Sequence, residues 1–430
     1  MSTPLRIAIA GLGTVGTGVA ELLQRNNVIH AARAGAACKL VAVSARTATA
    51  ERKSAAGKAE WVQDAIDLAT RDDVDLIVET IGGSEGVAKA LVEKALANGK
   101  HVVTANKALI AHHGAALAAL AETHNAQLAM EAAVAGGIPI LQALRTGLAA
   151  NTFTRVAGIL NGTCNYILTT MQHDGAEFSD VLADAQAKGY AEADPAFDID
   201  GVDAAHKLAI LAALAYGATP AIDAVHIEGI RHVTQRDIRY ADELGYRIRL
   251  LGIAAQGDEG ISTRVHPCLV PNNSPLGLTE GVFNAVQVEG DAVGRIFLQG
   301  RGAGGRPTAS AVVSDILAIA RGERWPTFTV KASQLSGVAP VPMAQHRCCY
   351  YIRLTVADEP GVLADVTRIF ADESISVKSI IQHTHDDTSP AQVVITTHET
   401  REQSMQKALK TIHELKRVIE PPMMLRMEMV

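Results

Sequence analysis

The residues best suited to chemistry lie in the segment 189–207, GYAEADPAFDIDGVDAAHK, which contains five carboxylates and one lysine. Asp203 and Lys207 are four residues apart, so a helix would place both on one face. An isolated pair at this spacing is usually an ordinary ion pair, worth roughly 0.2–0.5 kcal/mol. Here the predicted helix continues as LAILAALA, so Lys207 lies beside residues that must be buried.

Burial of this lysine would suit it to proton transfer. Desolvation disfavours the charged ammonium, so a buried lysine loses basicity and can exchange a proton near neutral pH. Reduction of an aldehyde by hydride requires such a group, because the new alkoxide must take up a proton as hydride arrives. The surrounding carboxylates could hold the ammonium group of a substrate. The segment is therefore typical of a site that reduces an aldehyde.

A glycine-rich turn near the start of the chain predicts a dinucleotide site. Gly11-Leu12-Gly13-Thr14-Val15-Gly16 directly follows a predicted strand, residues 6–10, and opens a predicted helix. In a G-x-G-x-x-G turn the first glycine makes the turn, the second lets the backbone approach a pyrophosphate, and the third allows close helix packing. The N-terminus of the helix adds aligned N–H groups. We expect these six residues to bind the cofactor.

The end of the second predicted strand indicates which dinucleotide binds. An acidic residue there would bind the ribose 2′-hydroxyl of NAD. This chain instead has Arg46, with Arg52 and Lys53 close behind it, so a 2′-phosphate would meet cations. We expect Arg46 and Lys53 to favour NADP, with NAD as the alternative cofactor. The alternative interpretation of Arg46 is that it lies on a solvated surface loop.

The elements that must position these residues follow a regular order from Leu5 to about Met130. Short β-branched runs alternate with alanine-rich helical stretches, which indicates a parallel sheet buried on both faces. We predict a doubly wound, Rossmann-type α/β domain over residues 1–135. Lys107 follows one of its predicted strands, and the carboxyl end of a parallel strand is where ligands bind. On the residues alone, Lys107 fits a surface position and a site position about equally well.

Two further domains are predicted after this one. Residues 136–302 mix long helices with strands and suit an α+β domain for substrate binding, catalysis and dimerisation. Residues 303–325 include a helix, 310–320, that we expect to pack back on the first domain. Residues 333–347 contain two prolines and little periodicity, which is typical of a linker.

The tail, residues 348–430, has the order βαββαβ of a small ferredoxin-like fold. Its predicted elements are a strand at 350–357, a helix at 362–372, strands at 376–382 and 392–397, a helix at 401–415 and a final strand within 424–429. Such a unit has an exposed sheet edge and usually pairs side by side. We therefore expect a homodimer or a homotetramer.

Composition excludes several classes of function. The net charge of −7 comes from 46 acidic and 39 basic residues, without long like-charge runs, so no nucleic-acid surface is expected. The five cysteines lack C-x-x-C spacing, which argues against a disulfide framework and a structural zinc site. About 18 apolar residues never occur in a row, and no signal peptide is visible. We expect a cytoplasmic protein that is not associated with a membrane.

Several stretches resemble the homoserine dehydrogenase family: GLGTVG, TANKALI, MEAAVAGGIPI, GILNGTCNYIL, GYAEADPAFDIDGVDAAHKLAIL and GAGGRPTASAVVSDI. The resemblance runs to about Arg321. After Tyr350, the stretch VADEPGVLADVTRIF resembles an ACT domain. The resemblance implies reversible NAD(P)H-dependent reduction of L-aspartate 4-semialdehyde to L-homoserine, a step in threonine, methionine and isoleucine biosynthesis.

The same resemblance implies roles for individual residues. Lys207 matches the proton-transferring lysine of the family, and Lys107 matches a second active-site lysine near the nicotinamide and the substrate. Asp203 and Glu192 match contacts to the amino and hydroxyl ends of homoserine, and Asp198 completes the acidic pocket.

The resemblance also implies a bound monovalent cation such as Na⁺. It further implies two backbone contacts to the nicotinamide side of the cofactor. Oxygens of Glu131, Val134, Gly136 and Ile138 match the cation ligands. A domain hinge that needs small residues explains that segment equally well. Gly189 and Gly302 match the backbone contacts.

The tail is expected to sense an amino acid. Gly361 lies at a strand-to-helix turn, 358–363, where ACT domains commonly receive an amino acid against backbone N–H groups. Feedback by threonine is the hypothesis, and a tail that only dimerises is the alternative. Many sensing domains have glycine or asparagine after the first helix, whereas this chain reads Asp372-Glu373-Ser374, which leaves the identity of the ligand open.

Three other interpretations of the sequence are less favoured. Cys164 as a nucleophile would indicate a semialdehyde-oxidising dehydrogenase that forms a thioester, but no general base is assigned to it and a packing thiol fits better. His383-Thr384-His385-Asp386-Asp387 could ligate a metal, although a solvated loop is favoured. A regulatory protein without turnover would not need the dense cluster of lysine and carboxylates.

Overall fold

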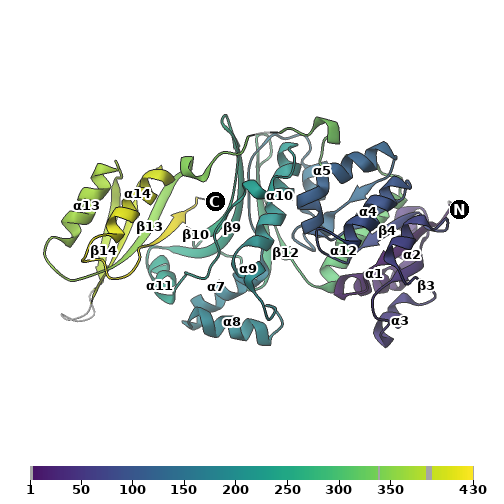
Figure 1. Cartoon of the computed structure of the whole chain (residues 1–430), viewed down its shortest axis with the longest axis horizontal. Helices are drawn as coiled ribbons and strands as arrows, with labels where there is room; N and C mark the ends of the chain where they lie inside the picture. Colours follow the sequence, from purple (N-terminus) through teal and green to yellow (C-terminus); the bar gives the residue numbers. More distant parts are fainter. Residues whose placement is uncertain (1–2, 338, 384–389, 430) are drawn as a thin grey trace.

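The computed structural model describes residues 3–337, 339–383 and 390–429. The three predicted regions follow one another along an elongated molecule, with the amino-terminal domain at one end and the tail at the other (Figure 1). Among the described residues, no helix is long and apolar enough to cross a membrane.

The amino-terminal domain is built on a six-stranded parallel sheet. Its strand order is β3-β2-β1-β4-β5-β6, which is the doubly wound order and confirms the predicted Rossmann-type fold. The strands are β1 (Leu5–Ala10), β2 (Cys38–Ser44), β3 (Glu60–Trp61), β4 (Leu76–Glu79), β5 (His101–Thr104) and β6 (Leu128–Ala129). The strand predicted around QLAMEAAV is only two residues long, because Glu131–Ala133 turn into a 3₁₀-helix.

Helices cover both faces of this sheet. Ala8 and Ala10 of β1 pack with α4 (Val87–Ala97) and α5 (Lys107–Thr123). Ile7 and Ile9, which point to the other face, pack with α1 (Thr14–Arg25), α3 (Ala50–Ala56) and α12 (Gly305–Ala320). α12 comes from far along the chain and starts earlier than the predicted helix. α2 (Asn27–Ala34) and β3 were not predicted.

The middle of the molecule is an antiparallel sheet with helices on one side. Its strands occur in the order β12-β11-β7-β9-β10. They are β7 (Phe153–Ile159), β9 (Tyr246–Gly257), β10 (Gly260–Pro271), β11 (Phe283–Gly290) and β12 (Gly294–Arg301), and the short β8 (His226–Ile227) pairs with β10. β12 was not predicted, and it extends to Arg301, close to the predicted end of this domain at residue 302. The other elements are α6 (Ile140–Gln142), α7 (Gly162–Asp174), α8 (Phe178–Ala187), α9 (Ala196–Ile199), α10 (Val202–Tyr216) and α11 (Gln235–Glu243).

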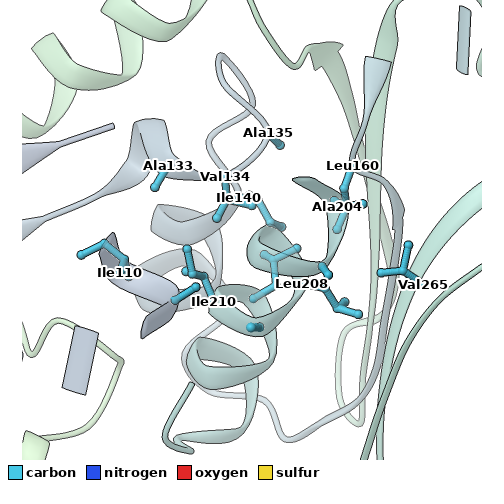
Figure 2. Packing of buried hydrophobic residues seen from close by; sticks show 14 of the residues in the cluster. Ile110, Ala133, Val134, Ala135, Ile140, Leu160, Ala204, Leu208, Ile210 and Val265 are labelled. Carbon is cyan, nitrogen blue, oxygen red and sulfur yellow. The ribbon is translucent and has the colours of Figure 1, made fainter. Parts of the chain in front are cut away.

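Helix α10 joins the first two domains. Its residues from Asp203 to Leu214 are all buried. Figure 2 shows Leu208 and Ile210 of α10 lying between Ile110 of α5 and Val265 of β10, and all four belong to one apolar cluster. The helix that carries Asp203 and Lys207 is therefore fixed by packing on both sides.

The tail has the predicted βαββαβ order. Its elements are β13 (Arg347–Val356), α13 (Val362–Asp372), β14 (Val377–His383), β15 (Ala391–Thr397), the short β16 (Thr400–Arg401), α14 (Glu402–His413) and β17 (Met423–Met427). The strands form the order β17-β13-β15-β14. β13 starts at Arg347, which we had placed in the linker.

One edge of the tail sheet is joined to the middle sheet. β17 pairs with β10 in parallel, with Arg426 opposite Cys268, so one continuous sheet crosses the boundary. Ion pairs reinforce this junction. Arg353 with Asp237 at 2.7 Å and Arg264 with Glu428 at 2.8 Å are buried, and buried Arg426 pairs at 2.7 Å with Glu228, which is partly exposed. β14 forms the opposite end of the sheet.

Candidate active site

A cleft of about 720 Å³ opens at the carboxyl ends of the parallel strands, above the glycine-rich turn. Gly11, Leu12 and Gly13 line this cleft. Thr14, Val15 and Gly16 are the first three residues of α1. Gly11 has φ of +96°, and a side chain there would approach Thr80 O to 2.6 Å. Gly13 has no atom within 4 Å of the position of a Cβ, so the turn leaves room for close approach by a ligand.

Two arginines lie at one end of this cleft. Arg46 and Arg52 line it, whereas Lys53 is exposed on α3 and is not among the lining residues. Asp64 also lines the cleft, but its carboxylate accepts a hydrogen bond from Ile66 N at 2.9 Å and caps the following 3₁₀-helix. Glu85, the second carboxylate of the lining, forms ion pairs with Lys89 and His113. Arg46 and Arg52 are therefore the positive groups available to an anionic ligand in this cleft.

A buried network at the other end of the cleft positions Lys107. Glu79, fully buried at the end of β4, accepts hydrogen bonds from Ile81 N, Gly82 N and the Thr104 hydroxyl. Asn106 donates to Gly83 O at 2.7 Å and caps α5 by accepting from Leu109 N at 3.1 Å. Sequence reasoning missed Glu79, although a carboxylate at the end of an apolar strand was a signal.

Lys107 and Lys207 flank one buried carboxylate. Lys107 Nζ lies 2.9 Å from Asp203 Oδ1, and Lys207 Nζ lies 2.6 Å from Asp203 Oδ2. Lys207 also donates to Leu160 O at 2.8 Å. An ammonium group has three donors, so these two contacts leave Lys207 one N–H for a further acceptor.

Asn161 connects this group to a second aspartate. Its amide nitrogen donates to Asp203 at 2.9 Å and to Asp198 at 2.8 Å, and its side-chain oxygen caps α7. Sequence reasoning assigned no role to Asn161. The available signal was its type, since asparagine is a common N-cap residue and Asn161 directly precedes α7.

The electrostatics follow from this geometry. Burial alone would raise the pKa of Asp203, but the two lysines outweigh it and hold that pKa below its ordinary value. Burial opposes protonation of Lys107, yet the charge of Asp203 raises the pKa of Lys107 above its ordinary value. Burial and the charge of Asp203 raise the pKa of Asp198. Asp203 is thus held ionised and Lys107 protonated.

The loop before α10 borders the cluster. Glu192 is exposed, and its charge contributes to the raised pKa of Lys107, so it lies near that lysine. The Phe197 ring lies 5.5 Å from Lys107 Nζ. Gly189 is exposed in the same loop, with φ of +73°. The structure therefore gathers Lys107, Lys207 and the three predicted carboxylates into one region.

The segment predicted to hold a monovalent cation is a buried turn between the first two domains. Glu131, Val134, Gly136 and Ile138 all lie in it, and a side chain on Gly136 would collide with the backbone of Gly302. Glu131 accepts hydrogen bonds from Leu141 N and Gln142 N. Gly302 thus lies against this turn.

The groups present in the turn fit a hard cation. Among the described residues, no hydrogen bond ends on the carbonyl oxygens of Val134 and Gly136. Burial, with the nearby charge of Asp315, raises the pKa of Glu131 to about 8, and burial raises the pKa of Asp315 to about 6. Available carbonyl oxygens beside two buried carboxyl groups are the ligands and charge that such a cation takes.

Cys164 lies near the cluster but is unsuited to nucleophilic attack. It is fully buried and donates through Sγ to Asp198 O at 3.2 Å. Burial and the charge of Asp198 raise the pKa of its thiol well above the ordinary value, and only a thiolate is strongly nucleophilic. These observations favour a packing thiol.

No cluster of three or more histidine, cysteine or acidic side chains with the arrangement of a metal site occurs in the part of the chain that the structure describes. The predicted loop His383–Asp387 lies outside the described residues, apart from the backbone of His383. In the tail, the turn at 358–363 lines a hollow of about 240 Å³, in which Gly361 has φ of +96°.

Comparison with protein families assigns all three regions. The family described as homoserine dehydrogenase, NAD binding domain matches residues 11–131, homoserine dehydrogenase matches residues 139–317, and ACT domain matches residues 350–417.

Known relatives cover the whole chain. It is 45% identical over 433 residues to homoserine dehydrogenase of Neisseria gonorrhoeae, with 99% of each chain covered. The crystal structure of a homoserine dehydrogenase from Thiobacillus denitrificans matches with a TM-score of 0.94 and 44% identity, covering 100% of this chain and 99% of that chain. A hyperthermophilic archaeal homoserine dehydrogenase in complex with NADPH matches with a TM-score of 0.64 and 28% identity, covering 75% of this chain and 99% of that chain.

Proposed function

The chain belongs to the homoserine dehydrogenase family of oxidoreductases that act on a CH–OH group, and we propose that it reversibly reduces L-aspartate 4-semialdehyde to L-homoserine with NADPH. The observation that carries this proposal is the pair of lysines on Asp203, one of which, Lys107, begins α5 shortly after β5 of the parallel sheet that bears the dinucleotide cleft. The test is NADPH-dependent conversion of the semialdehyde by the full chain, with L-homoserine identified as the product. A folded chain that converts none would reject the proposal.

NADPH would supply the hydride. Gly11 to Gly16 would hold its pyrophosphate at the N-terminus of α1. Arg46 and Arg52, at the edge of the cleft, would hold the 2′-phosphate, since guanidinium groups suit phosphate geometry. An archaeal relative described in complex with NADPH supports this preference. The Glu79–Thr104–Asn106 network would keep Lys107 at the nicotinamide end, with Gly189 and Gly302 as further backbone contacts.

Lys207 would donate the proton. Its remaining N–H can bond to the carbonyl oxygen of the semialdehyde, and this oxygen takes the proton from Nζ as it becomes the hydroxyl of homoserine. Asp203 keeps the Lys207 ammonium in place through the 2.6 Å contact. Lys107, held protonated by the same carboxylate, would orient the carbonyl and stabilise the negative charge that develops on its oxygen.

The substrate ammonium would bind to the acidic side of the site. Asp203 already accepts from both lysines and Asn161. Glu192 and Asp198 therefore have more capacity for a new donor, and we assign the ammonium chiefly to them with Asp203 completing the pocket. A monovalent cation such as Na⁺ would bind to the turn at Glu131, Val134, Gly136 and Ile138 and stabilise the hinge between the domains.

The tail would make the activity of the enzyme depend on the concentration of an end product of its pathway. An enzyme that forms homoserine serves threonine, methionine and isoleucine biosynthesis, and threonine would bind at the turn around Gly361 as a feedback inhibitor. The matched ACT domain and the hollow at this turn support the proposal. The β14 edge of the tail sheet would serve a homodimer or homotetramer.

A further inference from the structure

A separate cavity lies where the tail joins the middle domain. It encloses about 340 Å³ between β8, the first half of β10 and the segment 340–347 that leads into β13. We call it the junction cleft. It shares no lining residue with the dinucleotide cleft or with the hollow at the tail turn, and it contains none of the catalytic lysines and carboxylates.

One side of the junction cleft presents basic groups. His226, Arg264, His346 and Arg347 line it, and no acidic residue does. The carboxylates that pair with these groups, among them Glu428, are not lining residues. His226 pairs with Glu228, Arg264 and His346 pair with Glu428, and Arg347 pairs with Glu399. A ligand that enters the cleft therefore meets basic groups whose partner carboxylates do not line it.

Arg264 has a donor that the protein leaves unused. The residue is only 5% exposed, and its Nη2 donates to Glu428 at 2.8 Å. Its Nε is buried and has no hydrogen-bond partner among the described residues. By contrast, Arg426 in the same junction directs Nε, Nη1 and Nη2 to carboxylates. A buried guanidinium N–H without an acceptor is costly. The Nε atoms of Arg145, Arg155, Arg247 and Arg249 are also without a partner among the described residues, but none of these four residues lines the junction cleft, whereas Arg264 does. A ligand acceptor that reaches the Arg264 guanidinium would remove this cost.

The opposite side of the junction cleft is apolar and held in place. It consists of the segment 340–343, Pro-Val-Pro-Met. Val341 N donates to Ile261 O at 3.0 Å, and Pro340 forms a bridge to the same strand. Two prolines restrict the backbone further. An apolar wall opposite a few fixed polar groups, in a volume near the lower limit for small-molecule sites, suits a small amphiphilic ligand.

The junction cleft is connected to the candidate active site by short contacts. His226 lies 2.7 Å from Glu228. Two residues further on, Ile230 N donates to Ile199 O at 2.9 Å, and Ile199 directly follows Asp198 in α9. A ligand that displaces His226 therefore acts on the backbone that carries Asp198.

We propose that the junction cleft is an effector site for a small carboxylate with an aliphatic body. The carboxylate binds to Arg264 and Arg347, the aliphatic body packs on the segment 340–343, and occupancy changes the substrate KM through Glu228 and α9. This site is distinct from the tail turn at Gly361. The KM readout rests on the proposed function, whereas binding is measured without turnover.

The experiment is ligand-observed NMR on the full chain with butyrate and L-valine as probes. Butylamine tests the need for a carboxylate, and inorganic phosphate tests whether any anion suffices. We expect butyrate and L-valine to bind and the other two not to bind. Arg264→Gln and Arg347→Gln should each weaken binding about tenfold, the loss of one charge-assisted hydrogen bond. Arg321→Gln, which also breaks an exposed Arg–Glu pair, should leave binding unchanged.

Arg347→Gln decides the test, because Arg264 also holds Glu428 and its loss could disturb folding. Absence of binding by both probes, or equal binding to wild type and Arg347→Gln, would overturn the proposal. Binding that is lost in Asp358→Ala but kept in Arg347→Gln would place the ligand at the tail turn and overturn it too. Binding that leaves the substrate KM unchanged would contradict the effector role.

Discussion

Lys107 and Asp203 belong to different domains, yet Lys107 Nζ lies 2.9 Å from Asp203 Oδ1. Lys107 is the first residue of α5, beside the dinucleotide cleft, and Asp203 is in the first turn of α10. Under the proposed function, this contact would align the domain that binds the hydride donor with the helix that carries the proposed proton donor, Lys207. A shift between the two domains would break it.

Asp203→Asn tests the role of this shared carboxylate. The amide keeps the shape of the side chain but removes the charge that holds both lysines. We expect kcat to fall about 100-fold or more, the size of a lost acid–base contribution. The measurement is steady-state NADPH oxidation, with thermal unfolding as a check on folding. Asp200→Asn, which alters an exposed pair with Arg231, should change kcat little. Equal effects of the two variants would refute a special role for Asp203.

Arg46→Gln and Arg52→Gln test the cofactor preference. Each removes a cation that lines the dinucleotide cleft. We expect each to raise the KM for NADPH about tenfold while leaving that for NADH nearly unchanged, because only NADPH carries the 2′-phosphate. Lys53→Gln is the control, since Lys53 does not line the cleft. If Lys53→Gln had the larger effect, our placement of the 2′-phosphate would be wrong.

Much of the architecture could be predicted because it depends on local patterns. The glycine turn, the alternation of strands and helices, and the spacing of Asp203 and Lys207 all lie in short stretches of sequence. β12 escaped prediction because none of its residues is buried and because they include two glycines and two arginines. α2 follows α1 after a single residue, so no break marked a second helix.

Contacts that depend on docking between distant segments could not be predicted. The meeting of Lys107 with Asp203 requires α5 and α10 to pack together, and the pairing of β17 with β10 requires the tail to fold onto the middle domain. Asn161 lies about forty residues before Asp203 in sequence, and only the structure shows that it joins Asp198 and Asp203. Resemblance gave roles for single residues but not the network that orients them.

The pH dependence of stability tests the proposed cation site. The folded chain holds the proton of Glu131 more tightly than the unfolded chain, because the pKa of its carboxyl is raised from 4.5 to about 8. Ionisation of Glu131 therefore destabilises the fold: the penalty is absent below about pH 4.5, grows as the pH rises, and is complete above about pH 8. A bound Na⁺ would offset it.

At equal ionic strength and pH 8, we expect a higher Tm in sodium chloride than in choline chloride, with a smaller difference at about pH 5.5. Glu131→Gln should reduce the pH dependence of this difference, leaving the part due to Asp315, whose pKa is raised to about 6, and Glu323→Gln, at an exposed position, should preserve it. Equal Tm values in the two salts at pH 8 would count against a sodium site in this turn.

Gly361→Val tests the sensor. Gly361 has φ of +96° and lines the tail hollow, so a branched side chain would strain the turn and fill part of the hollow. We expect L-threonine to inhibit wild-type NADPH oxidation and the variant to lose this response while keeping its basal rate. Gly294→Val, in a hairpin of the middle domain with φ of +74°, is the matched control. Threonine that changes neither the activity nor the Tm of wild type would reject threonine as the effector.

The most direct test of the central claim is the rate of NADPH oxidation at saturating L-aspartate 4-semialdehyde, measured for wild type and Lys207→Ala together with NADPH binding. Lys188→Ala is the control, because Lys188 forms an exposed pair with Asp184 at the same i,i+4 spacing. We expect rapid oxidation by wild type and Lys188→Ala, and a loss of about 100-fold or more in Lys207→Ala with NADPH binding retained. Undiminished oxidation by Lys207→Ala would contradict the assignment of Lys207 as the proton donor.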